Sequence, residues 1–149
     1  MQKRIVIGSD HIGYPLKEYL KTFLKEMGWE VEDCGTHNRT RTDYPIYASK
    51  VAQKITSGEF ERGILICGSG VGMSITANKI HGIRAVVCSE PYSAVLSRKH
   101  NNSNILCMGS RVVGEELAEM IVHDWLAAEY EGGRHQKRLD MIHEIETEY

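Results

Sequence analysis

The chain has 149 residues, which suits a single domain spanning 1–149 with a substantial hydrophobic core. Its formal net charge of −2 gives no electrostatic sign of nucleic-acid binding, and no apolar run reaches the roughly 18 residues of a membrane span. The apolar run near the N-terminus is too short for a signal peptide, so we expect a cytoplasmic protein without a membrane partner.

Strands and helices alternate along the whole chain. In the first half the predicted elements are a strand over 4–8, a helix with Pro15 in its first turn that stops at Gly28, a strand over 30–34, and a helix from the possible N-cap Asp43 to Gly58. In the second half they are strands over 63–67, 84–88 and 104–108, a helix capped by Ser89 that runs to about His100, and a helix whose apolar face holds Leu117, Met120, Ile121 and Trp125. This alternation predicts a doubly wound α/β fold with five parallel strands and helices on both faces of the sheet.

A last helix is predicted over 134–149, after Gly132 and Gly133. It is mostly charged, and its apolar residues Leu139, Ile142 and Ile145 form only a narrow line. A helix with so thin a stripe buries little against its own domain. We interpret it as an arm that packs on a second subunit, with a solvent-facing tail as the alternative.

The most informative stretch is Ile64–Ser74, ILICGSGVGMS, in which a buried strand ends at Cys67 and a glycine-rich turn leads into a helix. Open α/β sheets place their chemistry at the carboxyl ends of strands, where Cys67 lies. The backbone N–H groups of such a loop suit an anion or a developing oxyanion. The other cysteines, Cys34, Cys88 and Cys107, are interpreted as small buried residues without a disulfide framework.

Met73 argues against two chemistries that this loop suggests. A dinucleotide fingerprint that starts at Gly68 needs glycine at position 73, where the chain has Met73. A fingerprint that starts at Gly8 needs glycine at position 10, where the chain has Asp10. A cysteine phosphatase needs arginine six residues after its cysteine, and Met73 occupies that position too.

A third chemistry, proton abstraction next to a carbonyl, needs a base, donors for an enediolate oxygen, a phosphate clamp and a group that opens a sugar ring. Cys67 can serve as the base, and Arg134 and Arg138 share a helical face that can bind a phosphate. His100 and the Asp10–His11 pair are the other candidates. From the residues alone, a core thiol and a solvated helix face are the alternatives.

Several blocks of the sequence resemble the ribose-5-phosphate isomerase B family, which also contains galactose-6-phosphate isomerase subunits and an allose-6-phosphate isomerase activity. The blocks cover almost the whole chain and are GSDHIG (8–13), RTDYP (41–45), GILICGSGVG (63–72), ANK (77–79), GIRA (82–85), RKHNN (98–102), LCMGSRVVG (106–114) and EGGRHQKR (131–138).

The resemblance implies interconversion of ribose 5-phosphate and ribulose 5-phosphate through an enediol, with no metal or other cofactor. It implies that Cys67 is the proton acceptor and that His100 donates a proton in ring opening, with Asp10 beside it. In another branch of the family a glutamate at the position of Met73 is the base. The implied substrate-binding residues are the backbone of Gly68, Ser69, Gly70, Val71 and Gly72 for the enediolate, Asn101 for the sugar, and His11, Arg111, Arg134 and Arg138 for the phosphate.

The resemblance also implies a homodimer or a dimer of dimers whose sites combine residues from two subunits. Two alternative functions stay open: an isomerase of six-carbon phosphates, for allose 6-phosphate or galactose 6-phosphate, and a catalytically silent module that binds sugar phosphates. The depth of the pocket decides the length of the substrate. We expect the loop over 35–42 to border that pocket.

Overall fold

Five parallel strands form one sheet in the order β2-β1-β3-β5-β4 in a computed structural model, which describes residues 3–149. The strands are β1 (Arg4–Ser9), β2 (Glu30–Asp33), β3 (Gly63–Cys67), β4 (Ala85–Val87) and β5 (Ile105–Gly109). The helices are α1 (Tyr14–Glu26), α2 (Tyr44–Thr56), α3 (Val71–Ala77), α4 (Pro91–Asn101), α5 (Glu115–Ala127) and α6 (Arg134–Glu148). Within these residues no helix combines the length and the apolar character that crossing a bilayer requires.

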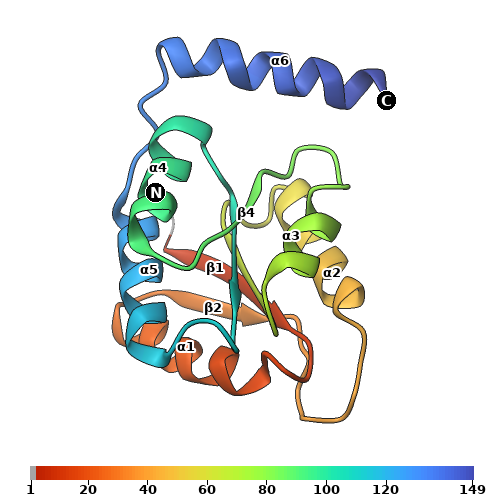
Figure 1. The fold of residues 1–149 in the computed structure, drawn as a ribbon, viewed down its shortest axis with the longest axis vertical. Helices are drawn as coiled ribbons and strands as arrows, with labels where there is room; N and C mark the ends of the chain where they lie inside the picture. The colour runs from red at the N-terminus through yellow and green to blue at the C-terminus, as the bar shows by residue number, and fades with distance from the viewer. Residues whose placement is uncertain (1–2) are drawn as a thin grey trace.

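Helices cover both faces of the sheet, with α1, α4 and α5 on one face and α2 and α3 on the other (Figure 1). Successive residues of β3 point to opposite faces: Ile64 and Ile66 pack toward α1 and α5, whereas Leu65 and Cys67 pack toward α2 and α3. Both faces are therefore buried, which explains why the strand is apolar throughout. The predicted doubly wound fold is confirmed.

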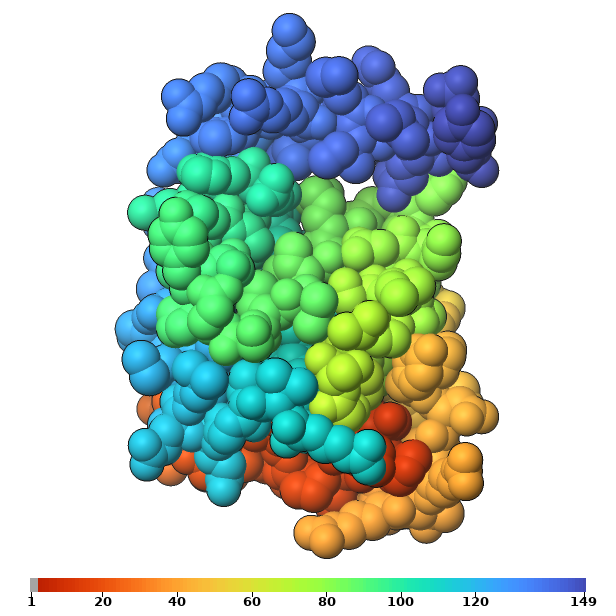
Figure 2. Space-filling model, in the orientation of Figure 1, coloured from red at the N-terminus to blue at the C-terminus, as the bar shows by residue number. Residues whose placement is uncertain are grey.

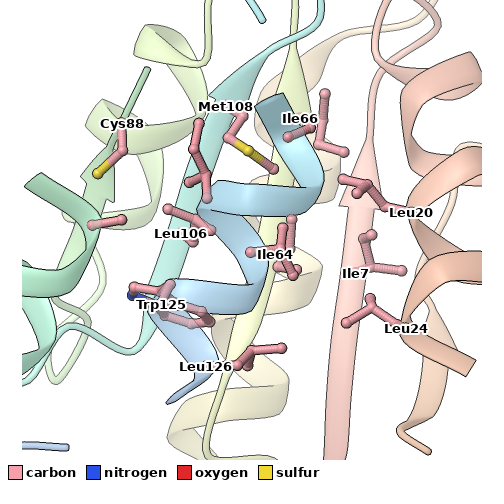
Figure 3. Close-up of a cluster of buried hydrophobic side chains, with 14 of the residues drawn as sticks. Ile7, Leu20, Leu24, Ile64, Ile66, Cys88, Leu106, Met108, Trp125 and Leu126 are labelled. Carbon is pink, nitrogen blue, oxygen red and sulfur yellow. The ribbon is translucent and has the colours of Figure 1, made fainter. Parts of the chain in front are cut away.

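The larger core lies between the sheet and α1, α4 and α5 (Figure 3). Ile64 and Leu106 on the sheet pack with Leu20 of α1 and Trp125 of α5, and all four are fully buried. The indole N–H of Trp125 donates to Ser103 Oγ over 2.9 Å, so its polar atom is satisfied inside the core. Burial of each such aliphatic side chain stabilises the fold by about 1.5–3 kcal/mol, and this core holds the strand ends in register.

Two details of the predicted helices are wrong. Glu90, not Ser89, is the N-cap of α4, because Pro91 occupies the first turn and the extended backbone of Glu90 lets its carboxylate accept the Ser93 N–H over 2.9 Å. Met120 is 56% exposed, because α5 turns the face that holds Ala118, Ile121 and Trp125 toward the sheet.

Helix α6 lies across one end of the molecule, beyond α4 (Figures 1 and 2). Leu139 is buried, but Ile142 and Ile145 are 51% and 59% exposed. One hydrogen bond near its end joins Glu146 Oε1 to the Gly82 N–H over 2.9 Å. The thin apolar stripe is confirmed, and packing on a second subunit stays a prediction.

Candidate active site

Three neighbouring strands, β1, β3 and β5, end side by side at one edge of the sheet. Asp10, Cys67 and Arg111 lie at or just beyond these ends and line one open cavity of about 620 Å³. The chain turns to opposite faces of the sheet after the adjacent strands β1 and β3, so the topological switch point lies at the cavity. The fold thus gathers three of the predicted site residues in the place where α/β sheets bind ligands.

Cys67 is the last residue of β3, and its side chain is 4% exposed at the wall of this cavity. Its sulfur accepts the backbone N–H of Gly70 over 3.2 Å. Burial raises the pKa of the Cys88 thiol to about 11 and the pKa of Cys107 well above the ordinary value. Those two thiols fit the predicted role of apolar filler, whereas Cys34 is only partly buried and departs from it.

The glycine loop needs glycine at position 70. Gly70 has a φ of +81°, and a Cβ there would lie 2.7 Å from the carbonyl carbon of Met108. Two backbone N–H groups of the glycine loop donate hydrogen bonds inside the loop. The Gly70 N–H donates to Cys67 Sγ, and the Val71 N–H donates to Ser69 Oγ over 3.2 Å. Gly68, Ser69, Val71 and Gly72 all line the cavity, and the binding of the enediolate by the backbone of this loop stays a prediction.

Asp10 is 6% exposed and is held in place by a tight turn. Its Oδ1 accepts the Gly13 N–H over 2.9 Å. Gly13 presses against β3 so closely that a Cβ there would lie 2.4 Å from the carbonyl oxygen of Ile66. The carboxylate of Asp10 therefore has little freedom to move, as a catalytic or orienting group requires.

A second cavity of about 630 Å³ adjoins the first and shares Ile12 and Arg111 with it. His11 and Arg39 also line it. The Thr42 N–H donates to His11 Nδ1 over 3.2 Å, so a neutral His11 carries its proton on Nε2 and can donate it to a ligand. Two guanidinium groups and an imidazole donor around one cavity suit a phosphate. Arg39 belongs to the loop over 35–42, so this loop borders the second cavity; that the substrate occupies this cavity stays a prediction.

Backbone hydrogen bonds fasten the loop after β5 onto its neighbours. The Arg111 N–H donates to the Gly68 carbonyl over 3.0 Å, and Ser110 Oγ donates to the Ile12 carbonyl over 3.1 Å. A Cβ on Gly68 would lie 3.7 Å from Nη1 of Arg111, so the guanidinium lies over the glycine loop. We call Asp10, His11, Cys67, the loop 68–72 and Arg111 the carboxyl-edge group.

The other predicted site residues lie at the opposite edge of the sheet, and we call them the α6-side group: His100, Asn101, Arg134 and Arg138. Helix α4 carries the chain back to the amino ends of the strands, so His100 and Asn101 at its end lie beside α6. Arg134 and Arg138 are exposed and one turn apart on α6. None of the four lines either cavity of the carboxyl edge.

His100 belongs to a cluster that sequence reasoning missed. Its ring stacks on that of His135 with centroids 4.3 Å apart and planes 15° apart. Both Nε2 atoms lie near Glu131 Oε1, at 3.8 Å from His100 and 3.5 Å from His135. Two imidazoles and a carboxylate within 4.8 Å of one another could hold a metal ion of the zinc type. Within the EGGRHQKR block, the i, i+4 spacing of Glu131 and His135 was the available signal.

Tyr44 and Arg39 are also cavity residues that the sequence analysis did not place in the site. The ring of Tyr44 lies so close to Gly72 that a Cβ there would be 2.5 Å from it, and Tyr44 lines the cavity beside Cys67. The RTDYP block, which contains Tyr44, was the available signal in the sequence.

Comparisons with known proteins find relatives that match almost the whole chain. The family model described as Ribose/Galactose Isomerase matches residues 5–142. The chain is 61% identical over 144 residues to ribose-5-phosphate isomerase B of Escherichia coli strain K12, covering 97% of each protein. It is 41% identical over 140 residues to D-erythrulose-4-phosphate isomerase of Pectobacterium atrosepticum, covering 93% of this chain and 91% of that relative. The solved structure of Clostridium thermocellum ribose-5-phosphate isomerase B matches with a TM-score of 0.97 at 55% identity, covering 98% of this chain and 99% of that one.

Proposed function

The chain belongs to the ribose/galactose isomerase family, and from that premise we propose that it interconverts ribose 5-phosphate and ribulose 5-phosphate. The observation that carries the proposal is the placement of Cys67. Cys67 lines a cavity that Asp10, residues of the glycine loop and Arg111 also line. The other three cysteines do not line that cavity.

Isomerisation moves a hydrogen from carbon 2 to carbon 1 and the carbonyl from carbon 1 to carbon 2. In the proposed mechanism Cys67 takes the proton from carbon 2 and returns it to carbon 1 through an enediolate, while the hydroxyl proton of oxygen 2 passes to oxygen 1. The glycine loop lies where it can stabilise the oxygens of that intermediate. No step of this scheme needs a metal ion or another cofactor.

Ring opening needs a proton donor for the ring oxygen and an acceptor for the proton of the anomeric hydroxyl. We assign the donor role to His100, with Asp10 beside it in the assembled site. One copy of the chain holds these residues at opposite edges of the sheet. We therefore propose that a second copy supplies the α6-side group, which makes the enzyme a homodimer or a dimer of dimers with shared sites. The exposed apolar stripe of α6, with Ile142 and Ile145, fits an intersubunit contact.

The phosphate of the substrate is proposed to bind between the two groups. His11 and Arg111 approach it from the carboxyl edge, and Arg134 and Arg138 from the partner's α6. Asn101 would contact the sugar. One relative is named D-erythrulose-4-phosphate isomerase. This name supports the inference that the fold of this family accepts sugar phosphates of different chain lengths. Allose 6-phosphate and galactose 6-phosphate are the alternative substrates, to be separated by competitive assays.

A cytoplasmic location is proposed alongside this function. All four cysteines are free thiols, and a reducing compartment such as the cytoplasm keeps cysteines in this state.

The test is exchange of the proton at carbon 2 in deuterated water, followed by NMR with ribose 5-phosphate. The wild type should exchange it, and Cys67→Ala should lose exchange and about 10²–10⁴-fold in kcat. Cys88→Ala is the matched control, because Cys88 is equally buried but does not line the cavity. Undiminished exchange in Cys67→Ala would overturn the assignment of the base. Binding of the substrate without exchange in the wild type would favour the silent module.

A further inference from the structure

A separate cavity of about 360 Å³ lies at the amino edge of the sheet, away from Cys67. Arg62 precedes β3, Arg84 precedes β4, and Arg98 comes from α4, and all three line this cavity. No residue of the carboxyl-edge group or the α6-side group lines it. The cavity is therefore distinct from the proposed active site.

Its three guanidinium groups carry charge without a matching carboxylate contact. Arg62 and Arg98 are only 6% and 7% exposed. Across residues 3–149, none of the three has a carboxylate oxygen within 4.0 Å. A buried charge normally has a counter-charge, because removing it from water is costly.

Their hydrogen bonds go to neutral groups. Arg62 donates to the carbonyl of Leu126 over 3.0 Å, and Arg98 donates to Asn102 Oδ1 over 3.0 Å and to the Ser103 carbonyl. Arg84 Nε donates to the Asn102 carbonyl over 2.8 Å. Nε of Arg98 is buried and has no partner. These bonds fix the side chains, but they leave the charge uncompensated.

Mutual repulsion is part of the energetics of this cavity. Burial, together with the charges of Arg62 and Arg84, lowers the pKa of Arg98 to about 10. Burial also lowers the pKa of Arg62 and of Arg84. Glu61, which lines the cavity, favours the charged forms of Arg62 and Arg98, and the more distant Glu129 and Glu146 favour those of Arg62 and Arg84. No carboxylate is in direct contact with any of the three guanidinium groups, so burial still outweighs this support. An anion in the cavity would relieve this imbalance.

We propose that the Arg62–Arg84–Arg98 cavity is a second anion site that binds a phosphate group. Guanidinium groups bind phosphate through paired hydrogen bonds, and the volume admits a phosphate alone or one carried by a small molecule. Occupancy stabilises the fold, because the ligand binds the folded chain and not the unfolded one. This inference does not depend on the proposed isomerase activity.

The experiment measures binding of labelled inorganic phosphate by equilibrium dialysis in a chain that carries Arg111→Gln and Arg134→Gln. These changes weaken the proposed substrate site, so phosphate that still binds reports on the amino-edge cavity. We expect one site per chain to persist. Adding Arg62→Gln should weaken it by about tenfold, because a charge-assisted contact is lost. Adding Glu61→Gln should strengthen it, because the opposing acid is removed.

Arg62→Gln could disturb the fold, because Arg62 packs beside Trp125. Glu61→Gln keeps the test decisive, because Glu61 is exposed and its replacement should leave the fold intact. Absence of binding, or binding that neither added substitution changes, would overturn the proposal. Adenosine 5′-monophosphate and inorganic phosphate are compared as competitors. Tighter competition by the nucleotide assigns the site to a phosphate monoester, and tighter competition by phosphate assigns it to the free ion.

Discussion

The two groups of proposed site residues differ in how the fold holds them. The carboxyl-edge group lies at the ends of three adjacent strands, and its loops are joined by backbone hydrogen bonds such as Arg111 N–H to Gly68 and Ser110 N–H to Cys67. The α6-side group lies on the end of α4 and on a helix whose outer face is exposed. One group is built into the sheet, and the other is presented outward from it.

This difference separates two tasks. A base and the donors for an enediolate need fixed geometry, which packed strand ends supply. Arginines that bind a phosphate tolerate more movement, and a protruding helix can carry them to another copy of the chain. His100 is the exception within its group, because stacking on His135 fixes its ring. The comparison thus predicts that Cys67 and His100 act in one site contributed by two chains.

The largest expected effect tests that sharing directly. Cys67→Ala and His100→Ala should each lose about 10²-fold or more in kcat. When equal amounts are refolded together, half of the dimers are mixed, and each mixed dimer holds one site with both residues intact. Activity should then return to about a quarter of the wild-type value. Steady-state assays before and after mixing measure the recovery.

The control for this experiment replaces the His100→Ala partner with a chain that carries both substitutions. Mixed dimers then contain no intact site, so activity should stay low. If mixed dimers form, as mass-tagged chains would reveal, and the original pair still shows no recovery, the two residues do not share a site.

A second prediction concerns the support of the carboxyl edge. Asp33 at the end of β2 accepts Lys17 Nζ over 2.5 Å and Lys21 Nζ over 2.8 Å, and its other oxygen accepts the Gly35 N–H over 2.8 Å. Lys17 is fully buried and would keep only the partly exposed Glu18, whose Oε1 lies 3.1 Å from its Nζ. Asp33→Asn therefore leaves a buried charge poorly compensated and should cost about 3 kcal/mol of unfolding free energy. Urea unfolding at fixed protein concentration measures it.

The same variant gives a pH signature. Burial opposes ionisation of Asp33, but hydrogen bonds from Lys17 and Lys21 outweigh it and lower its pKa below the ordinary value. A carboxylate with a lowered pKa stabilises the fold above its unfolded pKa of about 3.9 and loses that contribution as the pH falls further. The difference between wild type and Asp33→Asn should therefore shrink below about pH 4. Glu30→Gln, in an exposed pair on the same strand, should cost under about 1 kcal/mol and serves as control.

The carboxyl edge was the part of the molecule that the sequence made predictable. Apolar runs located the strands, and a parallel sheet necessarily brings Asp10 and Cys67 to one edge. The glycine spacing located the loop, but it did not reveal that Gly70 would donate its N–H to Cys67. That bond depends on the turn that Gly70 adopts at a φ of +81°.

Contacts between distant segments were not predictable in the same way. The stacking of His100 on His135 depends on how α6 docks against α4, and the Arg62–Arg84–Arg98 cavity joins residues that precede two different strands with a residue of α4. The sequence also placed Met120 on the core face of α5, because apolar character alone does not distinguish a buried position from an exposed one. Tertiary packing decides all three.

The smallest effect is expected from a substitution in the α6-side group. Arg134→Gln should raise KM about tenfold with a smaller change in kcat, because a charged phosphate contact is lost in ground state and transition state alike. Lys137→Gln is the matched control, since Lys137 is exposed on α6 beside Arg138 but outside the α6-side group. It should leave KM unchanged, and steady-state kinetics with ribose 5-phosphate compare the two. Equal increases in KM from both variants would show that α6 supplies only general positive charge and no specific contact to the phosphate. A selective increase would instead show that α6 reaches a defined phosphate, which one chain alone does not place beside Cys67.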